Sequence, residues 1–225
     1  PNLAAGCSLA ESADADDVAD RIIELKEQYP DLAVVSYVNT TAAVKAHTDV
    51  CVTSSNAVKI VNSLPNSTIL FLPDKNLANY VAQGTDKKII SWDGDCYVHH
   101  QIKPEQILEL KESLPDAKIM VHPECRTDVL EVADAVLSTS GMIRYAKESD
   151  SNEFIVVTEC GMSDRLSIEM PEKKFYKSCN LCKYMKMITI EDTKTALERL
   201  SPEVSLTPEI ISQARGSIER MLELS

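Results

Sequence analysis

The sequence repeats itself with an offset of 85 residues, and this repeat constrains the fold more than any other feature. Residues 29–61 align without a gap on residues 114–146. Each copy is followed by a further hydrophobic segment, a Lys-Lys pair and a cysteine, Cys96 or Cys182. Repeats of this length indicate copies of one supersecondary unit. The aligned copies share a proline and three polar residues, at Pro30 and Pro115, Asp31 and Asp116, Asp49 and Asp134, and Ser55 and Ser140.

A third cysteine extends the pattern toward the N-terminus. Cys7 lies 89 residues before Cys96, which lies 86 residues before Cys182. Cys7 thus has the position of the cysteine that closes a repeat, although only six residues precede it. We expect a pseudo-threefold arrangement, of which this sequence holds two complete copies and the tail end of a first one.

Predicted helices and strands alternate through both copies. In the first copy, the hydrophobic segments 32–37, 50–53, 69–72 and 88–92 are predicted strands, separated by helical patterns. Such alternation indicates βαβ units with parallel sheets, so the predicted fold class is α/β, with small three-layer α/β/α domains. The expected divisions are the tail of a first domain at 1–14, complete repeats at 15–100 and 101–190, and C-terminal helices at 191–225.

The composition narrows the class of partner. A net charge of −12 disfavours nucleic acid and anionic membranes, because both need a basic surface. No apolar run approaches the roughly 18 residues of a membrane span, and no signal peptide is visible. Seven cysteines, an odd number, favour reduced thiols over a secreted disulfide framework. We therefore expect a cytoplasmic protein that acts on small molecules.

Polar residues follow the equivalent first strand of each copy. Tyr37 and Asn39 stand at this place in the first copy, and His122 and Glu124 in the second. Ligands of open α/β sheets bind at the carboxyl ends of the strands. A tyrosine, an amide, an imidazole and a carboxylate at one axis can supply a general acid, a general base and orienting donors. An isolated His-Pro-Glu run is more often part of a surface loop, but its register with the first copy favours a site.

Hydroxyl side chains also stand before two predicted helices. Residues 53–56, which include Ser54, match residues 138–141, which include Ser138 and Thr139. Hydroxyls and free backbone N–H groups at a helix N-terminus can bind a carboxylate or a phosphate. The same residues are equally typical of helix N-caps, so either role is open at this point.

The three repeat-equivalent cysteines form the strongest metal-site pattern. Thiolates from Cys7, Cys96 and Cys182 would suit zinc or an iron–sulfur cluster, and three ligands leave one coordination position open. The CxxC formed by Cys179 and Cys182 offers an alternative, either a redox pair or half of a zinc site. The repeat register instead leaves Cys179 as a spare thiol that could form a disulfide with Cys182. The remaining cysteines are predicted to pack as small hydrophobic residues, namely Cys51, Cys125 and Cys160.

Several long runs carry a family resemblance: PNLAAGCSLA, YVNTTAAVKAHTDVCVTSSNAV, PDKNLANYV, GDCYVHH, HPEC, STSGM, TECGM and CxxCKYMKMI. In these runs, which cover essentially the whole chain, the sequence resembles quinolinate synthase of de novo NAD synthesis. The resemblance implies three α/β domains around a [4Fe–4S] cluster, with one cysteine ligand from each domain. It implies cluster ligands at Cys7, Cys96 and Cys182, catalytic roles for Tyr37, His122 and Glu124, and substrate contacts from these three and from Asn39, Ser54, Ser138 and Thr139.

The implied reaction condenses iminoaspartate with dihydroxyacetone phosphate to give quinolinate, with loss of phosphate and two waters. An open iron of the cluster would act as a Lewis acid, Glu124 as the base, and Tyr37 as an acid or a hydrogen-bond donor. An aspartate oxidase or dehydrogenase is the expected source of iminoaspartate. Because the resemblance lacks the family's first domain, we expect this chain alone to be inactive or severely impaired.

Two other classes of function remain open from the sequence. A non-catalytic iron–sulfur or zinc-binding redox sensor would need the cysteines but not Tyr37, Asn39, His122 or Glu124, whose presence favours the enzyme. A thiol–disulfide oxidoreductase would use Cys179 and Cys182, so a Cys179→Ser variant would lose its function.

Overall fold

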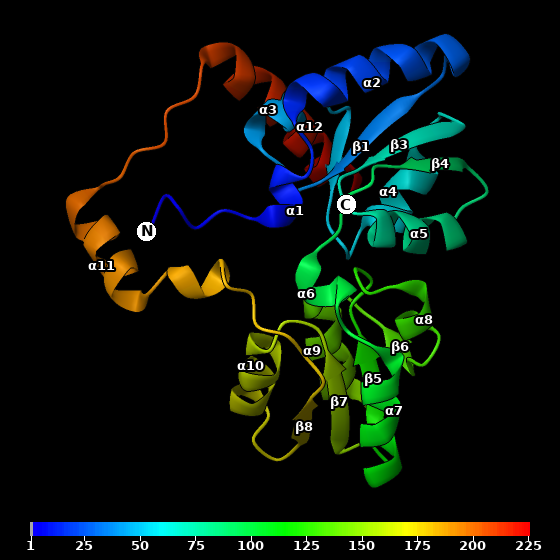
Figure 1. Cartoon of the computed structure of the whole chain (residues 1–225), viewed down its shortest axis with the longest axis vertical. Helices are drawn as coiled ribbons and strands as arrows, with labels where there is room; N and C mark the ends of the chain where they lie inside the picture. The colour runs from blue at the N-terminus through cyan, green and yellow to red at the C-terminus, as the bar shows by residue number, and fades with distance from the viewer. Residues whose placement is uncertain (1) are drawn as a thin grey trace.

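The computed structural model describes residues 2–225, which form two α/β domains (Figure 1). Each domain has a four-stranded sheet in which all pairings are parallel, with strand order β2-β1-β3-β4 in the first and β6-β5-β7-β8 in the second. The two orders are the same when each domain is numbered from its own first strand. The predicted fold class, repeated α/β domains with parallel sheets, is confirmed.

The first domain is a three-layer sandwich. Alternate strand residues face opposite sides of a sheet, so Val34 and Leu70 pack with α2 and α3, whereas Val35 and Phe71 pack with α4 and α5 on the other face. All these strand residues are buried. The elements are α2 (Ala15–Gln28), β1 (Ala33–Tyr37), α3 (Ala42–Ala46), β2 (Val50–Val52), α4 (Ala57–Ser63), β3 (Thr68–Leu72), α5 (Lys75–Gln83) and β4 (Lys88–Ser91).

The second domain repeats this construction. One face of its sheet packs Ile119 and Ile155 against α7 and α8, and the other packs Met120 and Phe154 against α9 and α10. The short helix α6 (Tyr97–His100) follows the first domain and leads into the second. The elements are α7 (Pro104–Ser113), β5 (Lys118–Val121), α8 (Thr127–Leu130), β6 (Ala135–Val136), α9 (Thr139–Glu148), β7 (Glu153–Val157), α10 (Gly161–Glu169) and β8 (Lys174–Lys177).

Hydrogen bonds show that the sequence repeat is also a repeat in space. The carboxylate of Asp49 accepts the backbone N–H of Val34 at 2.7 Å, and that of Asp134 accepts the backbone N–H of Ile119 at 2.8 Å. Each aspartate precedes the second strand of its domain and fixes it against the first strand. The two aspartates that the alignment pairs therefore have the same structural role.

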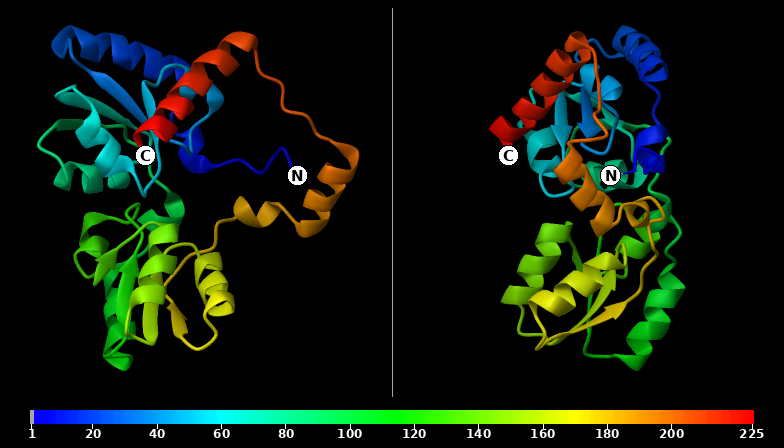
Figure 2. Two further views of the ribbon diagram at one scale, coloured as in Figure 1. Left: turned by 180° about the vertical axis from the view of Figure 1, so that it is seen from behind. Right: turned by 90° about the vertical axis from the view of Figure 1, so that its left-hand side faces the viewer.

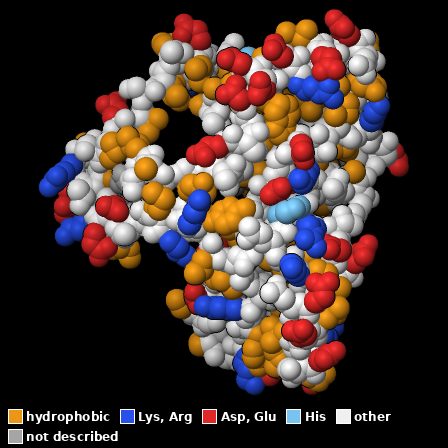
Figure 3. Space-filling model, in the orientation of Figure 1, with side chains coloured by type: hydrophobic (Ala, Val, Ile, Leu, Met, Phe, Trp, Pro, Cys, Tyr) orange, Lys and Arg blue, Asp and Glu red, His pale blue; other side chains and the backbone are white. Residues whose placement is uncertain are grey.

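The remaining helices lie near the two ends of the chain, before the first domain and after the second. Helix α12 returns to the first domain and packs against α3 and β2, with Ala214 and Met221 buried (Figure 2). Helix α11 and the residues that join it to α12, 190–207, form an arm. This arm stands away from the two domains and leaves an open space between itself and them (Figure 3). Among the described residues, no helix combines the length and the apolar character that a membrane span requires. The elements are α1 (Ser8–Glu11), η1 (Met185–Met187), α11 (Ile190–Arg199) and α12 (Pro208–Leu224).

Candidate functional site

A cavity of about 560 Å³ lies where the carboxyl ends of the two sheets face one another. Residues from both domains, from the N-terminal segment and from the segment before α11 line it. Eight of the ten site residues predicted from the sequence are among them, namely Cys7, Tyr37, Asn39, Cys96, His122, Glu124, Thr139 and Cys182. Ser54 and Ser138 are not in the wall of the cavity.

Three separate segments bring the three cysteines to this cavity. Cys7 precedes α1, Cys96 precedes α6, and Cys182 lies in the loop after β8. All three thiols are free and half-buried. Burial, and then the charge of Glu124, raise the pKa of the Cys96 thiol to about 12, so metal binding there must release a proton. Three soft sulfur donors around one cavity suit an iron–sulfur cluster or zinc, which is the donor chemistry that the sequence predicts.

The pairing of the spare cysteine differs from the prediction. Cys179 forms a disulfide with Cys160 and not with Cys182. Cys160 was predicted to pack as a small hydrophobic residue, and that prediction is wrong. The two cysteines follow the adjacent parallel strands β7 and β8, which bring their Cα atoms to 5.1 Å, whereas the sequence shows only the nearness of Cys179 and Cys182. An oxidoreductase based on a Cys179–Cys182 pair therefore loses its geometric basis.

A carboxylate and two imidazoles form the buried polar centre of the cavity. Oε2 of Glu124 lies 3.1 Å from Nδ1 of His122 and 3.7 Å from Nδ1 of His99. The two rings stack with centroids 4.7 Å apart, and Nε2 of His99 lies 2.8 Å from the hydroxyl of Thr158. All three side chains are at least nine-tenths buried. The pair predicted from the sequence, His122 and Glu124, is thus in direct contact.

The electrostatics of this group fix its protonation near neutral pH. Burial raises the pKa of Glu124, but the hydrogen bond from His122 and the nearby imidazoles of His99 and His122 together outweigh it and leave that pKa below its usual value. Burial lowers the pKa of His99 to about 4, so its ring is neutral. An ionised carboxylate only accepts hydrogen bonds, so the 3.1 Å approach assigns a proton to Nδ1 of His122. The 3.4 Å approach of the Glu124 backbone N–H to the same Nδ1 is then only a weak contact.

Tyr37 supplies a neutral hydrogen-bond donor to the cavity from the first domain. It is the last residue of β1, and its side chain is buried. Burial, and then the charge of Glu124, raise the pKa of Tyr37 well above its usual value, although a hydrogen bond with the Ser54 hydroxyl partly opposes them. Tyr37 therefore keeps its proton at any physiological pH. Ser54 acts on the cavity through this tyrosine and not by lining it.

The second predicted hydroxyl turn divides its roles between neighbours. The Ser138 hydroxyl accepts the backbone N–H of Gly141 at 3.2 Å and so caps α9. Thr139, one residue later, lines the cavity. In the matching turn of the first domain, Asn56 Oδ1 accepts the backbone N–H of Thr53 at 2.6 Å. Of the two roles that the sequence leaves open for Ser138, the observed hydrogen bond is that of a helix N-cap.

Comparison with known proteins identifies the family. The family model described as quinolinate synthetase A protein matches residues 1–223. Quinolinate synthase 1 of Methanosarcina acetivorans is 46% identical over 224 residues, which cover 99% of this chain and 72% of the relative. The chain belongs to the quinolinate synthase family. The quinolinate synthases of Xylella fastidiosa and Sinorhizobium fredii are 43% and 46% identical over all of this chain, which spans 65% and 61% of their lengths.

Three site residues of this family member were missed by the sequence analysis. His99 lies in the cavity beside Glu124, Glu159 lines the cavity after β7, and Asp74 is buried behind Cys96. Burial, and then the charge of Glu124, raise the pKa of Asp74 to about 7. Asp74 and Glu159 are separated by 85 residues, so applying the strand-end argument to the third strand of each repeat would have found both.

A second metal-ligating group overlaps the cysteine triad. One ligand atom each from Cys96, His99 and Glu124 lie within 4.8 Å of one another. Nδ1 of His99 has no hydrogen-bond partner among residues 2–225 and faces this group. The cavity of this quinolinate synthase family member thus offers a three-cysteine set and a mixed Cys-His-Glu set, with Cys96 common to both.

Proposed function

We propose that this cavity is the active site of a quinolinate synthase, which condenses iminoaspartate with dihydroxyacetone phosphate in de novo NAD synthesis. The observation that carries the proposal is that eight residues predicted from the family resemblance line one cavity. The net reaction forms quinolinate, phosphate and two waters. It is a condensation with dehydration and needs no oxidant or nucleotide.

Glu124 is the proposed general base of the reaction. Its carboxylate is ionised, buried and held in place by the Nδ1–H of His122, so it can accept a C–H or N–H proton in a site sheltered from water. His99 supports the pair by stacking on the His122 ring.

Both domains supply the proposed binding groups, Tyr37 and Asn39 from the first and Thr139 from the second. The Tyr37 hydroxyl keeps its proton, so it can donate to an oxygen on which charge develops. The Asn39 amide and the Thr139 hydroxyl line the same cavity and can hold the carboxylates or the phosphate of the substrates. Ser54 lowers the pKa of Tyr37, and Ser138 caps the helix that carries Thr139. These roles complete the set of predicted site residues.

The proposed cofactor is a [4Fe–4S] cluster on Cys7, Cys96 and Cys182. Their thiols are free, reach the cavity from three segments and leave one coordination position without a cysteine. Such a cluster would supply an open iron that acts as a Lewis acid on a hydroxyl or carboxylate. We further propose a cytoplasmic location and delivery of iminoaspartate by an aspartate oxidase or dehydrogenase.

Isotope-labelled substrates and mass spectrometry would test this function on the anaerobically reconstituted chain. Quinolinate should form in the wild type and fall to background in Glu124→Gln, while the iron content stays the same. Because the chain spans 61–72% of the lengths of the three relatives, we expect a rate far below that of a complete relative. Cluster uptake with equal quinolinate formation in both proteins would contradict the assignment of Glu124.

A further inference from the structure

An acidic residue stands at the same place in both domains, directly beyond the third strand. Asp74 lies two residues after β3, and Glu159 lies two residues after β7. Each also forms a single parallel bridge to the loop that follows the fourth strand, with Gly94 and Asn180 as partners. These loops carry the cavity cysteines. Both carboxylates therefore sit between a sheet edge and a cysteine loop.

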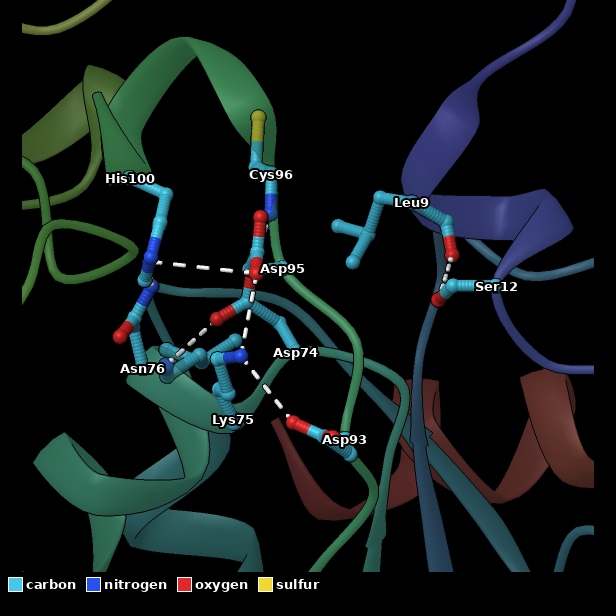
Figure 4. A network of polar contacts seen from close by, with 10 residues as sticks. Leu9, Ser12, Asp74, Lys75, Asn76, Asp93, Asp95, Cys96 and His100 are labelled. Carbon is cyan, nitrogen blue, oxygen red and sulfur yellow. Dashed lines mark hydrogen bonds and ion pairs between the residues drawn. The ribbon is translucent and has the colours of Figure 1, made fainter.

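In the first domain, the two carboxylate oxygens of Asp74 have different partners. Oδ1 accepts the backbone N–H of Leu77 at 2.7 Å. Oδ2 accepts the backbone N–H of Cys96 at 3.0 Å, and Figure 4 shows these two residues side by side. The Asp74 side chain is fully buried. The same loop is held from outside by Lys75, which pairs with Asp93 and Asp95 at 3.0 and 3.1 Å. Asp74 is thus the inner attachment of the Cys96 loop.

In the second domain, Glu159 makes the same division. Oε2 accepts the backbone N–H of Gly161 at 2.7 Å, and Oε1 accepts the backbone N–H of Cys182 at 3.3 Å. Its side chain is 12% exposed and lies 3.4 Å from the Lys186 ammonium. One oxygen is fixed by the start of α10, and the other reaches the cysteine loop. The pattern of the first domain recurs although the side chain is one carbon longer.

Helix capping alone does not account for this pattern. An aspartate that caps a helix needs one oxygen for the helix N–H, and glutamate is not among the preferred N-cap residues. In both domains the second oxygen binds the backbone N–H of a cavity cysteine. Two different side chains thus reach equivalent cysteine N–H groups from equivalent positions. The shared feature is the support of the cysteine.

We infer that Asp74 and Glu159 are positioning residues for the metal site, each of which anchors one cysteine loop to the edge of its sheet. The inference rests on the proposed function, because it assigns the cysteines to a cluster. Groups behind the ligands of a metal site orient those ligands, and their loss commonly weakens metal binding about 10- to 100-fold. Without either carboxylate, its cysteine keeps its thiol but loses the fixed backbone that directs the thiol into the cavity.

The first test needs no metal. Asp74→Asn and Glu159→Gln each keep one acceptor oxygen, which we expect to stay with the shorter bond to Leu77 or Gly161. In the metal-free chain, Asp74→Asn should then accelerate amide hydrogen exchange at Cys96 and leave it unchanged at Cys182. Glu159→Gln should accelerate exchange at Cys182 and leave it unchanged at Cys96. Asp86→Asn and Glu172→Gln are matched controls, because they remove the same charge from exposed positions and leave both cysteine amides unchanged.

The second test uses the chain after anaerobic reconstitution with iron and sulfide. Iron release to a chelator should be about 10- to 100-fold faster in Asp74→Asn and Glu159→Gln than in the wild type, and unchanged in both controls. Thermal unfolding of the metal-free proteins shows whether a variant is folded. If the buried Asp74→Asn does not fold, the more exposed Glu159→Gln carries the test. Release rates equal to those of the controls overturn the inference and leave the proposed function intact, whereas a wild type that takes up no iron overturns both.

Discussion

The two domains share a framework but present different chemistry at the ends of their first strands. Both sheets have the same strand order, and Asp49 and Asp134 bind the same kind of backbone N–H in each. At the end of β1, however, the chain supplies a neutral phenol in Tyr37, whereas beyond β5 it supplies an ionised carboxylate in Glu124. For these side chains, the shared aspartates support the fold, whereas the residues that differ belong to the proposed active site.

The sharpest test of this division replaces one group on each side. Glu124→Gln keeps the shape but removes the base, so kcat should fall about 10²- to 10⁴-fold with little change in KM. Asn39→Ala removes a binding group and should mainly raise KM. Initial rates of labelled quinolinate formation, measured anaerobically at several substrate concentrations, separate the two effects. A mainly KM effect of Glu124→Gln would remove the distinction between a binding side and an acid–base side.

Removal of the disulfide, which only the second domain has among the described residues, should have the next largest effect. The Cys160–Cys179 disulfide closes a loop in the second domain, and the first domain has no disulfide among its described residues. The Cys160→Ser variant should lower the free energy of unfolding of the second domain by about 3 kcal/mol, because its unfolded chain gains freedom. Denaturant unfolding followed by hydrogen exchange resolves the two domains. Reductant should reproduce the loss in the wild type and add nothing in the variant; an equal loss in the first domain would show that the effect is not local.

The shared aspartates should show similar and smaller effects. Asp49→Asn and Asp134→Asn each remove a charged acceptor from a strand N–H, and we expect about 1 kcal/mol of lost stability at pH 7 in either domain. Burial raises the pKa of Asp134, but the Ile119 N–H and Lys118 outweigh it and leave that pKa below its usual value. The Asp134 contribution is therefore present above about pH 4 and disappears as the pH falls through the lowered pKa. Urea unfolding of the wild type and Asp134→Asn between pH 7 and 3 should show curves that converge; a constant gap would contradict this origin.

The arm belongs to neither repeat and should have the smallest effect. Leu197 on α11 is 73% exposed, so Leu197→Gln removes no buried contact. Its free energy of unfolding should stay within about 0.5 kcal/mol of the wild type. Met221→Ala on α12, which is buried in the first domain, is the matched comparison and should cost about 2 kcal/mol or more. A similar loss in both variants, measured by urea unfolding, would mean that the arm is packed in solution.

Much of the fold can be predicted from the sequence, because each element of the repeat occurs in two copies that must agree. The spacing of Asp49 and Asp134 predicts equivalent strands, and the strand ends predict that Tyr37 and Glu124 meet. Side-chain direction is a different matter, since Ser54 reaches Tyr37 and not the cavity. The disulfide was missed because Cys160 and Cys179 are joined by strand pairing and not by a local motif.

The supporting carboxylates were missed for a simpler physical reason. Asp74 and Glu159 occupy the same position in the two copies, 85 residues apart, but they are different residue types, so the identities that the copies share do not single them out. Their common property is an oxygen that reaches a backbone N–H, and this depends on the position of the neighbouring loop. Any residue type can donate a backbone N–H, so the sequence does not show which residue the oxygen binds. Such second contacts become visible only in three dimensions.

The return of α12 to the first domain sets an order of assembly during protein synthesis. Ser217 lies against Cys51 at 3.4 Å, and Met221 completes the core around β2. All residues of the second domain leave the ribosome before these two do. The second domain can therefore finish folding while the first still exposes part of its core, which reverses the order in which these two domains are synthesised. A nascent chain halted before α12 would hold a finished second domain beside an incomplete first one.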